Sequence, residues 1–257
     1  MLNYTNIFIL IIALLCTYYI FTYINNKEHK QCNKSTENFQ IIKNPDLNIK
    51  PKQEFYDKSI FPELDLINSS IIKQELLEYM NDSNKWTEWP EYELWKESNP
   101  NSSWKVIPII AFGKPSEKNI SIFTKTVNEL KKIPNLVTAG FSKLGTGTTL
   151  SFHKGWAKLS NNVLRCHLGL IVPKNKCKIM VTQDNNYPDL TNIKAMYQKE
   201  NKWIIFDDSL YHSASNDSES DRIVLILDIK RPENIALGTS DIGYSEELDN
   251  FMNEFIK

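Results

Sequence analysis

Two of the chain's four histidines lie in stretches whose residue types could hold a metal ion. His153 stands in "SFHKGW" and His212 in "DDSLYHSASND". A pair of imidazoles suits iron, zinc or copper, and the coordination positions that the protein leaves open are those that a reaction uses. In many non-haem iron sites the residue two places after the first histidine is a carboxylate ligand. Here that residue is Gly155, which has no side chain to bind a metal.

The segment 163–173, "VLRCHLGLIVP", places a cation and an imidazole on one face of a predicted strand. Alternate side chains of a strand share a face, so Arg165 and His167 point the same way. The opposite face is apolar and suits a core; it comprises Leu164, Cys166, Leu168, Leu170 and Val172. A buried charge without a partner is strongly unfavourable, so we expect an anion to meet Arg165 and His167.

Two further strands add polar side chains to the same kind of face. In 222–232, "RIVLILDIKRP", Arg222 shares a face with Asp228, and in 136–144 Ser142 shares a face with Thr138 and Gly140. Two arginines, a histidine and a serine facing one interior describe a pocket for a small dicarboxylate. Arginine suits this role because its planar fork binds a carboxylate through two hydrogen bonds.

The elements that must position these groups are two helical segments followed by a run of strands. Apolar spacing near 3.6 predicts helices over 61–82 and 119–134. Strands are predicted over 104–114, 136–144, 163–173, 177–183, 202–209 and 222–232. This order, without a repeat or a βαβ pattern, indicates a mainly β sandwich or barrel with helices packed on one side.

An aromatic-rich segment precedes the first of these strands. Residues 86–95 read "WTEWPEYELW" and are interrupted by Pro90. The segment suits a loop packed over the core, or alternatively one wall of a substrate groove. The sequence leaves both interpretations open.

Composition excludes several classes of function. The chain has 257 residues and a formal net charge of -1, from 30 basic and 31 acidic residues. No long basic tract is present, so a nucleic-acid partner is not expected. The four cysteines show no C-x-x-C pair, which argues against a zinc finger or a disulfide-rich module.

The N-terminal region predicts a membrane anchor. Residues 7–24 form an uncharged stretch of 18 residues, just long enough to cross a bilayer. A cleaved signal peptide is the alternative, but its basic start and small-residue cleavage site are missing. Residues 25–55 are rich in Asn and Lys, which predicts a flexible tether. We therefore expect a single-pass protein with a retained anchor at 1–24.

The side of the membrane is not decided by the sequence. Lys27, Lys30 and Lys34 follow the span, which by the positive-inside rule favours a cytosolic domain. Glycosylation sequons lean weakly towards a lumenal domain; they begin at Asn3, Asn33, Asn68, Asn81, Asn101, Asn119 and Asn216.

Four motifs together resemble the aspartyl/asparaginyl β-hydroxylase family of 2-oxoglutarate-dependent iron oxygenases. They are "FSKLGTGTTLSFHKG", "LRCHLGLIVPKNKCKI", "IIFDDSLYHSASND" and "DRIVLILDIKRP", and they keep the order of the family across roughly residues 104–232. The resemblance implies a double-stranded β-helix (jelly-roll) core with flanking helices. It also explains Gly155, since this family's motif resembles His-x-Gly and lacks the carboxylate ligand.

The resemblance further implies roles for individual residues. His153 and His212 would bind Fe(II), and Asp208 would lie in the outer sphere and hold a metal-bound water. The implied 2-oxoglutarate contacts are Ser142, Arg165, His167 and Arg222. Arg222, assisted by Ser142, would take the carboxylate far from the metal, and Arg165 and His167 the near end. O2 is the implied co-substrate, with ascorbate in support.

The implied domain covers residues 56–232, with its motifs in 104–232, and a C-terminal tail with a short helix covers 233–257. The leading expectation for its activity is hydroxylation of an aspartyl or asparaginyl side chain in a peptide or protein. The first alternative is a membrane-associated hydroxylase of lipid acyl chains, which would give the anchor a purpose. The second is a catalytically inactive binding module, which the complete set of site residues argues against.

Overall fold

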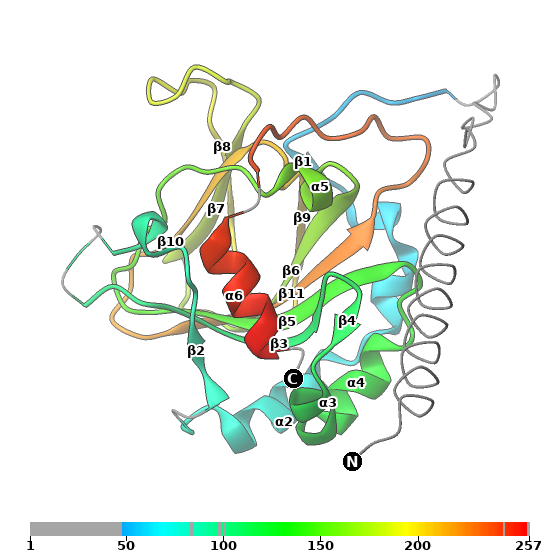
Figure 1. The fold of residues 1–257 in the computed structure, drawn as a ribbon, viewed down its shortest axis with the longest axis vertical. Helices are drawn as coiled ribbons and strands as arrows, with labels where there is room; N and C mark the ends of the chain where they lie inside the picture. Colours follow the sequence, from blue (N-terminus) through cyan, green and yellow to red (C-terminus); the bar gives the residue numbers. More distant parts are fainter. Residues whose placement is uncertain (1–47, 83–84, 97–98, 100, 244, 256–257) are drawn as a thin grey trace, which may run out of the picture. The chain divides into compact units, whose positions relative to one another are not determined.

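A computed structural model describes residues 48–82, 85–96, 99, 101–243 and 245–255, which form two antiparallel sheets flanked by helices (Figure 1). The larger sheet has eight strands in the order β1-β9-β6-β11-β5-β3-β2, with β4 paired to β3, and the smaller has the order β10-β7-β8. A mainly β, antiparallel fold is therefore confirmed. The predicted membrane span at 7–24 lies outside the described residues, and within them no helix is long and apolar enough to cross a bilayer.

The larger sheet carries most of the predicted strands. It contains β1 (Phe55–Tyr56), β2 (Thr87–Glu88), β3 (Trp104–Ala111), β4 (Lys114–Pro115), β5 (Leu136–Leu144), β6 (Val163–Ile171), β9 (Trp203–Phe206) and β11 (Arg222–Lys230). The smaller sheet contains β7 (Cys177–Thr182), β8 (Lys194–Tyr197) and β10 (Tyr211–Asn216). From β6 onwards the chain passes back and forth between the two sheets, so residues distant in sequence meet in the space between them.

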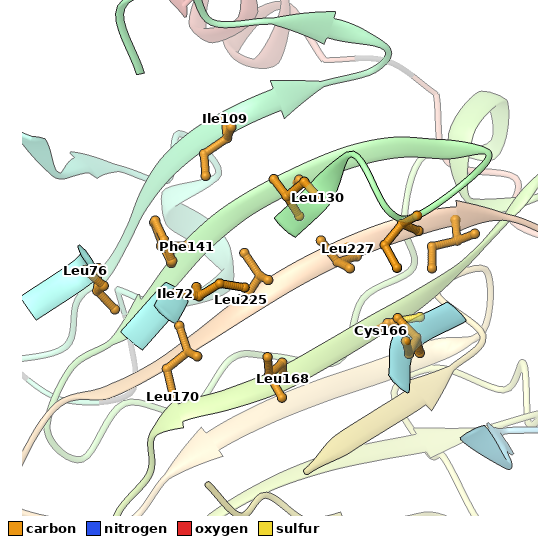
Figure 2. Packing of buried hydrophobic residues seen from close by; sticks show 14 of the residues in the cluster. Ile72, Leu76, Ile109, Leu130, Phe141, Cys166, Leu168, Leu170, Leu225 and Leu227 are labelled. Atoms are coloured by element: carbon orange, nitrogen blue, oxygen red, sulfur yellow. The ribbon is translucent and has the colours of Figure 1, made fainter. Parts of the chain in front are cut away.

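One face of the larger sheet packs against helices α2 (Ser69–Tyr79), α3 (Glu117–Ile122) and α4 (Thr124–Leu130). Figure 2 shows Ile72 of α2 beside Leu225 of β11, and Leu76 and Leu170 belong to the same buried cluster. The strand residues of this cluster alternate along β6 and β11 as the sequence predicts, and burial of the whole cluster is the main stabilising contribution to this layer. The apolar face predicted for 163–173 is thus the core face of β6.

Polar side chains fix the N-terminal ends of α2 and α4. Asn68 begins α2 by accepting hydrogen bonds from the backbone N–H groups of Ser70 and Ile71. Glu75 of α2 accepts hydrogen bonds from the N–H groups of Lys125 and Thr126, at 2.9 and 2.7 Å, at the start of α4. Since the first N–H groups of a helix have no partner within it, this buried contact orients α4 on α2.

The other face of the larger sheet packs against the smaller sheet. This second core joins Val106 and Leu144 of the larger sheet to Ile179 and Val181 of β7. The C-terminal helix α6 (Glu246–Phe255) contributes Leu248, Phe251 and Met252 to it. Short helical turns complete the fold: η1 (Lys58–Ile60), η2 (Pro62–Leu66), η4 (Tyr92–Leu94) and α5 (Ala157–Ser160).

Some element boundaries differ from the prediction. The helix predicted over 119–134 is two short helices that meet at Phe123, and only 69–79 of the segment 61–82 is α-helical. Strands β8 and β10 are not predicted by the sequence. Residues 48–55, expected in the tether, belong to the folded part, where Glu54 is buried and Lys50 pairs with Ile235.

Candidate active site

The two candidate metal ligands lie side by side between the sheets. His212 is the second residue of β10, and His153 lies on an irregular extended segment beside it. Each backbone N–H donates to the carbonyl oxygen of the other histidine, at 3.0 and 2.9 Å. The centroids of the imidazole rings are 4.3 Å apart. The backbone pairing therefore brings the two side chains together, as the sequence expects.

Both imidazoles are held in the form that can bind a metal. Nδ1 of His153 lies 2.8 Å from the carbonyl oxygen of Ser151, and Nδ1 of His212 lies 2.9 Å from that of Leu210. A carbonyl oxygen only accepts, so each Nδ1 carries the proton and each Nε2 keeps a free lone pair. Burial lowers the pKa of His153 to about 3 and that of His212 to about 4. Both rings are neutral at physiological pH.

Gly155 leaves the space that the carboxylate of Asp208 occupies. A Cβ atom at position 155 would come within 1.9 Å of Oδ2 of Asp208. Oδ1 of Asp208 is 3.3 Å from Nε2 of His212, and burial raises the pKa of Asp208 to about 6. Within the described part of the chain, no three His, Cys, Asp or Glu side chains are arranged to hold a metal ion. Asp208 thus adjoins the histidine pair without completing a three-ligand site.

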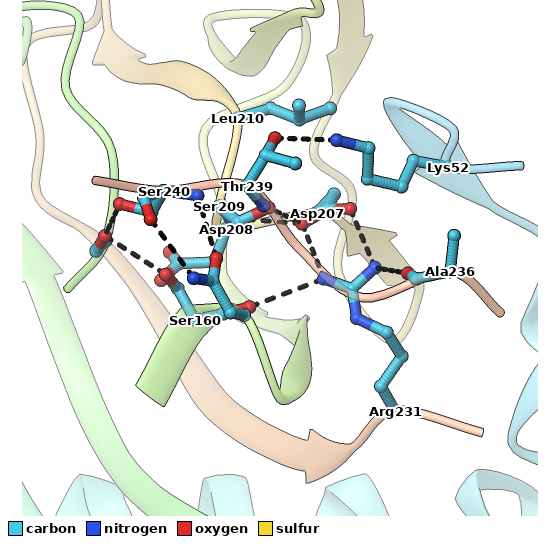
Figure 3. A network of polar contacts seen from close by, with 12 residues as sticks. Lys52, Ser160, Asp207, Asp208, Ser209, Leu210, Arg231, Ala236, Thr239 and Ser240 are labelled. Carbon is cyan, nitrogen blue, oxygen red and sulfur yellow. Dashed lines mark hydrogen bonds and ion pairs between the residues drawn. The ribbon is translucent and has the colours of Figure 1, made fainter. Parts of the chain in front are cut away.

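The backbone around Gly155 and Asp208 is fixed by buried polar contacts (Figure 3). The carbonyl oxygen of Gly155 accepts hydrogen bonds from the hydroxyl groups of Ser160 and Ser240, at 3.0 and 2.5 Å. Beside it, the guanidinium of Arg231 donates two hydrogen bonds to the carboxylate of Asp207, at 2.7 and 2.8 Å. A bidentate buried pair of this kind holds the turn that presents Asp208.

Substituting Gly155 by alanine should disturb Asp208 before any other group. Because the added Cβ cannot fit beside the carboxylate, we expect a loss of about 1–3 kcal/mol in the free energy of unfolding. Impaired iron-dependent turnover should accompany it. Gly243→Ala is the matched control, since a Cβ there would meet nothing within 4 Å. Chemical denaturation of both variants measures the difference, and equal stabilities would contradict the crowding.

The anion that the sequence expects at Arg165 is supplied by the protein. The guanidinium donates from Nε and Nη2 to the carboxylate of Asp228, at 2.8 and 3.0 Å. Its Nη1 lies 2.5 Å from Oδ1 of Asp208. Arg165 and Asp228 are directly opposite in the β6–β11 register. Two carboxylates of the protein therefore already occupy the guanidinium that was expected to contact a bound co-substrate.

Arg222 lacks such a partner. It is 1% exposed, and neither its Nε nor its Nη1 has a hydrogen-bond partner among the described residues. Burial lowers its pKa to about 10. Nε2 of His167 is likewise buried without a partner, and Ser142 accepts a hydrogen bond of 3.1 Å from the indole N–H of Trp104. These groups line one cavity together with His153 and His212.

The chemistry of this cavity fits iron with a chelating dicarboxylate. Two free imidazole nitrogens lie at one side, and a buried cation with unused donors lies in the same cavity. A buried guanidinium is strongly destabilising until an anion meets it, and a carboxylate matches its fork. All the site residues predicted from the sequence except Asp208 line this cavity, which suits that ligand set.

Sequence reasoning missed three residues of the site. Trp104 orients Ser142, Asp228 pairs with Arg165, and the amide nitrogen of Gln198 lies 3.3 Å from Nδ1 of His167. The inward position of Asp228 on its strand was a usable signal. Gln198 follows β8, a strand without an apolar pattern, so nothing in the sequence singles it out.

A second cavity adjoins the first and opens beside His153, Gly155 and Asp208. Its walls are mostly apolar and include residues of the aromatic-rich segment and of α6; among them are Trp89, Trp104, Phe112, Trp156, Phe251 and Met252. The interpretation of 86–95 as one wall of a groove agrees with this lining, because Trp89 and Glu91 both face the cavity.

Two antiparallel sheets enclose a histidine pair and an arginine-lined pocket, the set of groups that the sequence led us to expect of a 2-oxoglutarate-dependent non-haem iron hydroxylase. Residues 67–232 match the family model described as Aspartyl/Asparaginyl beta-hydroxylase, so the chain belongs to this family. The family assignment made from the sequence is therefore confirmed.

The relatives differ in what they hydroxylate. The chain is 36% identical over 137 residues to an ornithine lipid ester-linked acyl 2-hydroxylase of Rhizobium tropici, a match that covers 53% of this chain and 45% of that protein. It is 31% identical over 173 residues to the human aspartyl/asparaginyl beta-hydroxylase, covering 65% of this chain and 20% of that protein. The chain thus spans less than half the length of each of these relatives.

The similarity to solved structures is more distant. A Trichoplax adhaerens prolyl hydroxylase, in complex with a hypoxia inducible factor peptide, superposes with a TM-score of 0.44 at 10% identity, covering 65% of this chain and 79% of that chain. A 2OG-Fe(II) oxygenase family protein from Burkholderia pseudomallei gives a TM-score of 0.40 at 11% identity, covering 55% and 72%.

Proposed function

We propose that this protein is an Fe(II)- and 2-oxoglutarate-dependent dioxygenase that hydroxylates a C–H bond of its substrate. His153 and His212 would hold the iron, and Arg222, Ser142 and His167 would hold 2-oxoglutarate. The observation that carries the proposal is the juxtaposition of two unprotonated Nε2 atoms with a buried arginine whose donors are unused. The order of the strands supports the finer description of the core as a double-stranded β-helix.

The protein's own residues bind and orient in this scheme. Iron and 2-oxoglutarate supply the oxidising chemistry when bound, with O2 as oxidant and succinate and CO2 as products. Arg222 would neutralise the carboxylate of 2-oxoglutarate far from the metal, and the buried N–H of His167 would donate to the near end. Asp208 would accept a hydrogen bond from a water beside the histidines, and the aromatic wall would exclude other water from the reacting carbon.

Two substrate classes remain candidates. Hydroxylation of an aspartyl or asparaginyl side chain is supported by the similarity to the human relative. Hydroxylation of a lipid acyl chain is supported by the similarity to the Rhizobium relative and by the aromatic walls of the cavity beside His153. If the substrate is a lipid, the anchor proposed at 7–24 would hold the domain close to it, whichever side of the membrane the domain occupies.

Succinate formation by the full chain tests the activity. We expect succinate to form from 2-oxoglutarate in the presence of Fe(II), ascorbate and O2, and to cease when a chelator removes the iron. An acidic Asp-containing peptide and an acylated lipid, added separately, show which substrate stimulates turnover. The absence of both succinate and bound iron would contradict the proposal.

A further inference from the structure

The cavity beside His153 is walled by stacked aromatic rings. The indole of Trp89 lies between those of Trp104 and Trp156, with centroids 4.8 and 6.1 Å away. Phe251 of α6 meets Trp89 edge-on, with centroids 5.5 Å apart. Helix α6 lies beyond residue 232, where the family match ends, whereas Trp89, Trp104 and Trp156 lie within it. Such a surface stabilises an apolar chain by burial.

The charged groups of this cavity do not favour an acidic substrate. Its lining includes three carboxylates, of Glu91, Asp208 and Asp228, and two cations, of Lys154 and Arg165. Arg165 is engaged by Asp208 and Asp228, and the ammonium of Lys154 lies 3.1 Å from the carboxylate of Asp241. An incoming carboxylate would therefore meet no cation that lacks a partner among the described lining residues.

Glu91 is the carboxylate of this lining that forms no ion pair with a described Lys or Arg, although it feels the charge of Arg165. Its Oε2 accepts a hydrogen bond of 2.9 Å from the indole N–H of Trp89, and Trp156 also donates to it. Among the described residues, no Lys or Arg lies within ion-pair distance of it. Burial raises the pKa of Glu91. A cation placed here would relieve the electrostatic penalty of the half-buried carboxylate.

We propose that this cavity, which we call the ammonium groove, binds a substrate that carries an ammonium group on an apolar chain. Glu91 would bind the ammonium, and the aromatic rings of Trp89, Trp156 and Phe251 would pack along the chain. This inference rests on the proposed function, because it names the substrate class for the same site. It makes Glu91 a specificity-determining residue.

Binding of three probes with the same apolar chain tests the groove. Decylammonium, decan-1-ol and decanoate differ only in their polar end, and calorimetry below their aggregation concentrations measures each affinity for the full chain. We expect decylammonium to bind at least about tenfold more tightly than decanoate, since one close charge interaction in a partly buried site is worth roughly that factor. Decan-1-ol should lie between them.

The Glu91→Gln variant should bring the affinities of decylammonium and decanoate to near equality while leaving that of decan-1-ol almost unchanged. Glu93→Gln is the matched control, because it removes the same charge from an exposed side chain two residues away. Equal affinities in the native protein would overturn the proposal. So would a preference for decylammonium that survives in Glu91→Gln, or competition by an acidic Asp-containing peptide.

These measurements need neither turnover nor iron, so they separate the groove from the activity. A preference for decylammonium that depends on Glu91, in a protein that forms no succinate, would support the ammonium groove and contradict the proposed hydroxylation. Succinate formation without any preference among the probes would support the proposed hydroxylation and contradict the ammonium groove.

Discussion

Replacing either His153 or His212 by alanine is expected to abolish iron binding. Each ring presents an unprotonated Nε2, and the part of the chain that the structure describes offers no third ligand to compensate for a loss. Loss of a supporting contact alone typically weakens metal affinity by about 10- to 100-fold, so loss of one of two direct ligands should exceed that range. Succinate formation should fall in parallel.

Iron content after reconstitution under anaerobic conditions measures this effect directly. His167→Ala is the matched control, because His167 is buried in the same cavity but its Nδ1 is occupied by Gln198 and its proposed partner is 2-oxoglutarate. That control should retain iron. Unchanged circular dichroism would show that all three variants keep the fold, and retention of iron in either metal-ligand variant would refute the assignment.

The inward-facing residues of the site could be predicted because side chains alternate between the two faces of a strand even where both faces are buried. Arg165, His167 and Arg222 lie on the faces that strand geometry assigns them, opposite the core residues of β6 and β11. The partner of Arg165 could not be predicted in the same way. Asp228 was visible on an inward face, but the register that sets it opposite Arg165 depends on how two distant strands align.

The elements that escaped prediction are those without an apolar pattern. Strand β10, "YHSASN", is buried over most of its length although nearly all its side chains are polar. The Ser213 hydroxyl donates to the carbonyl oxygen of Leu150, and the Asn216 amide donates to the carbonyl oxygens of Leu144 and Gly145, all far along the chain. A strand stabilised by such contacts carries no hydrophobic period to read. His212 was therefore located by its motif and not by its strand.

The helix boundaries were predicted wrongly because they too depend on contacts between distant residues. The apolar period of 119–134 runs through Phe123, where the chain ends one short helix and begins another. The break is stabilised by Glu75, which receives the N–H groups that open α4. This contact joins residues about 50 positions apart, so local propensity could not reveal it.

Arg222→Ala should chiefly raise the requirement for 2-oxoglutarate. Its guanidinium is the buried cation with unused donors in the cavity that contains both histidines, and a charge-assisted pair with a carboxylate is among the stronger hydrogen-bonded contacts. Losing that pair should raise the KM for 2-oxoglutarate by about 10- to 100-fold, equivalent to ~1.4–2.8 kcal/mol. Iron binding should persist, because the histidines are untouched.

The stability of the same variant distinguishes a binding role from a structural one. In the ligand-free protein Arg222 is a buried cation with unsatisfied donors, so its removal should leave the melting temperature unchanged or higher. In the native protein, 2-oxoglutarate should raise the melting temperature by mass action, and Arg222→Ala should lose most of that increase. Arg222→Lys, which keeps the charge without the fork, should recover part of it. A ligand-free Arg222→Ala protein that melts well below the native one, but still responds fully to 2-oxoglutarate, would make Arg222 a structural residue and move the carboxylate site elsewhere.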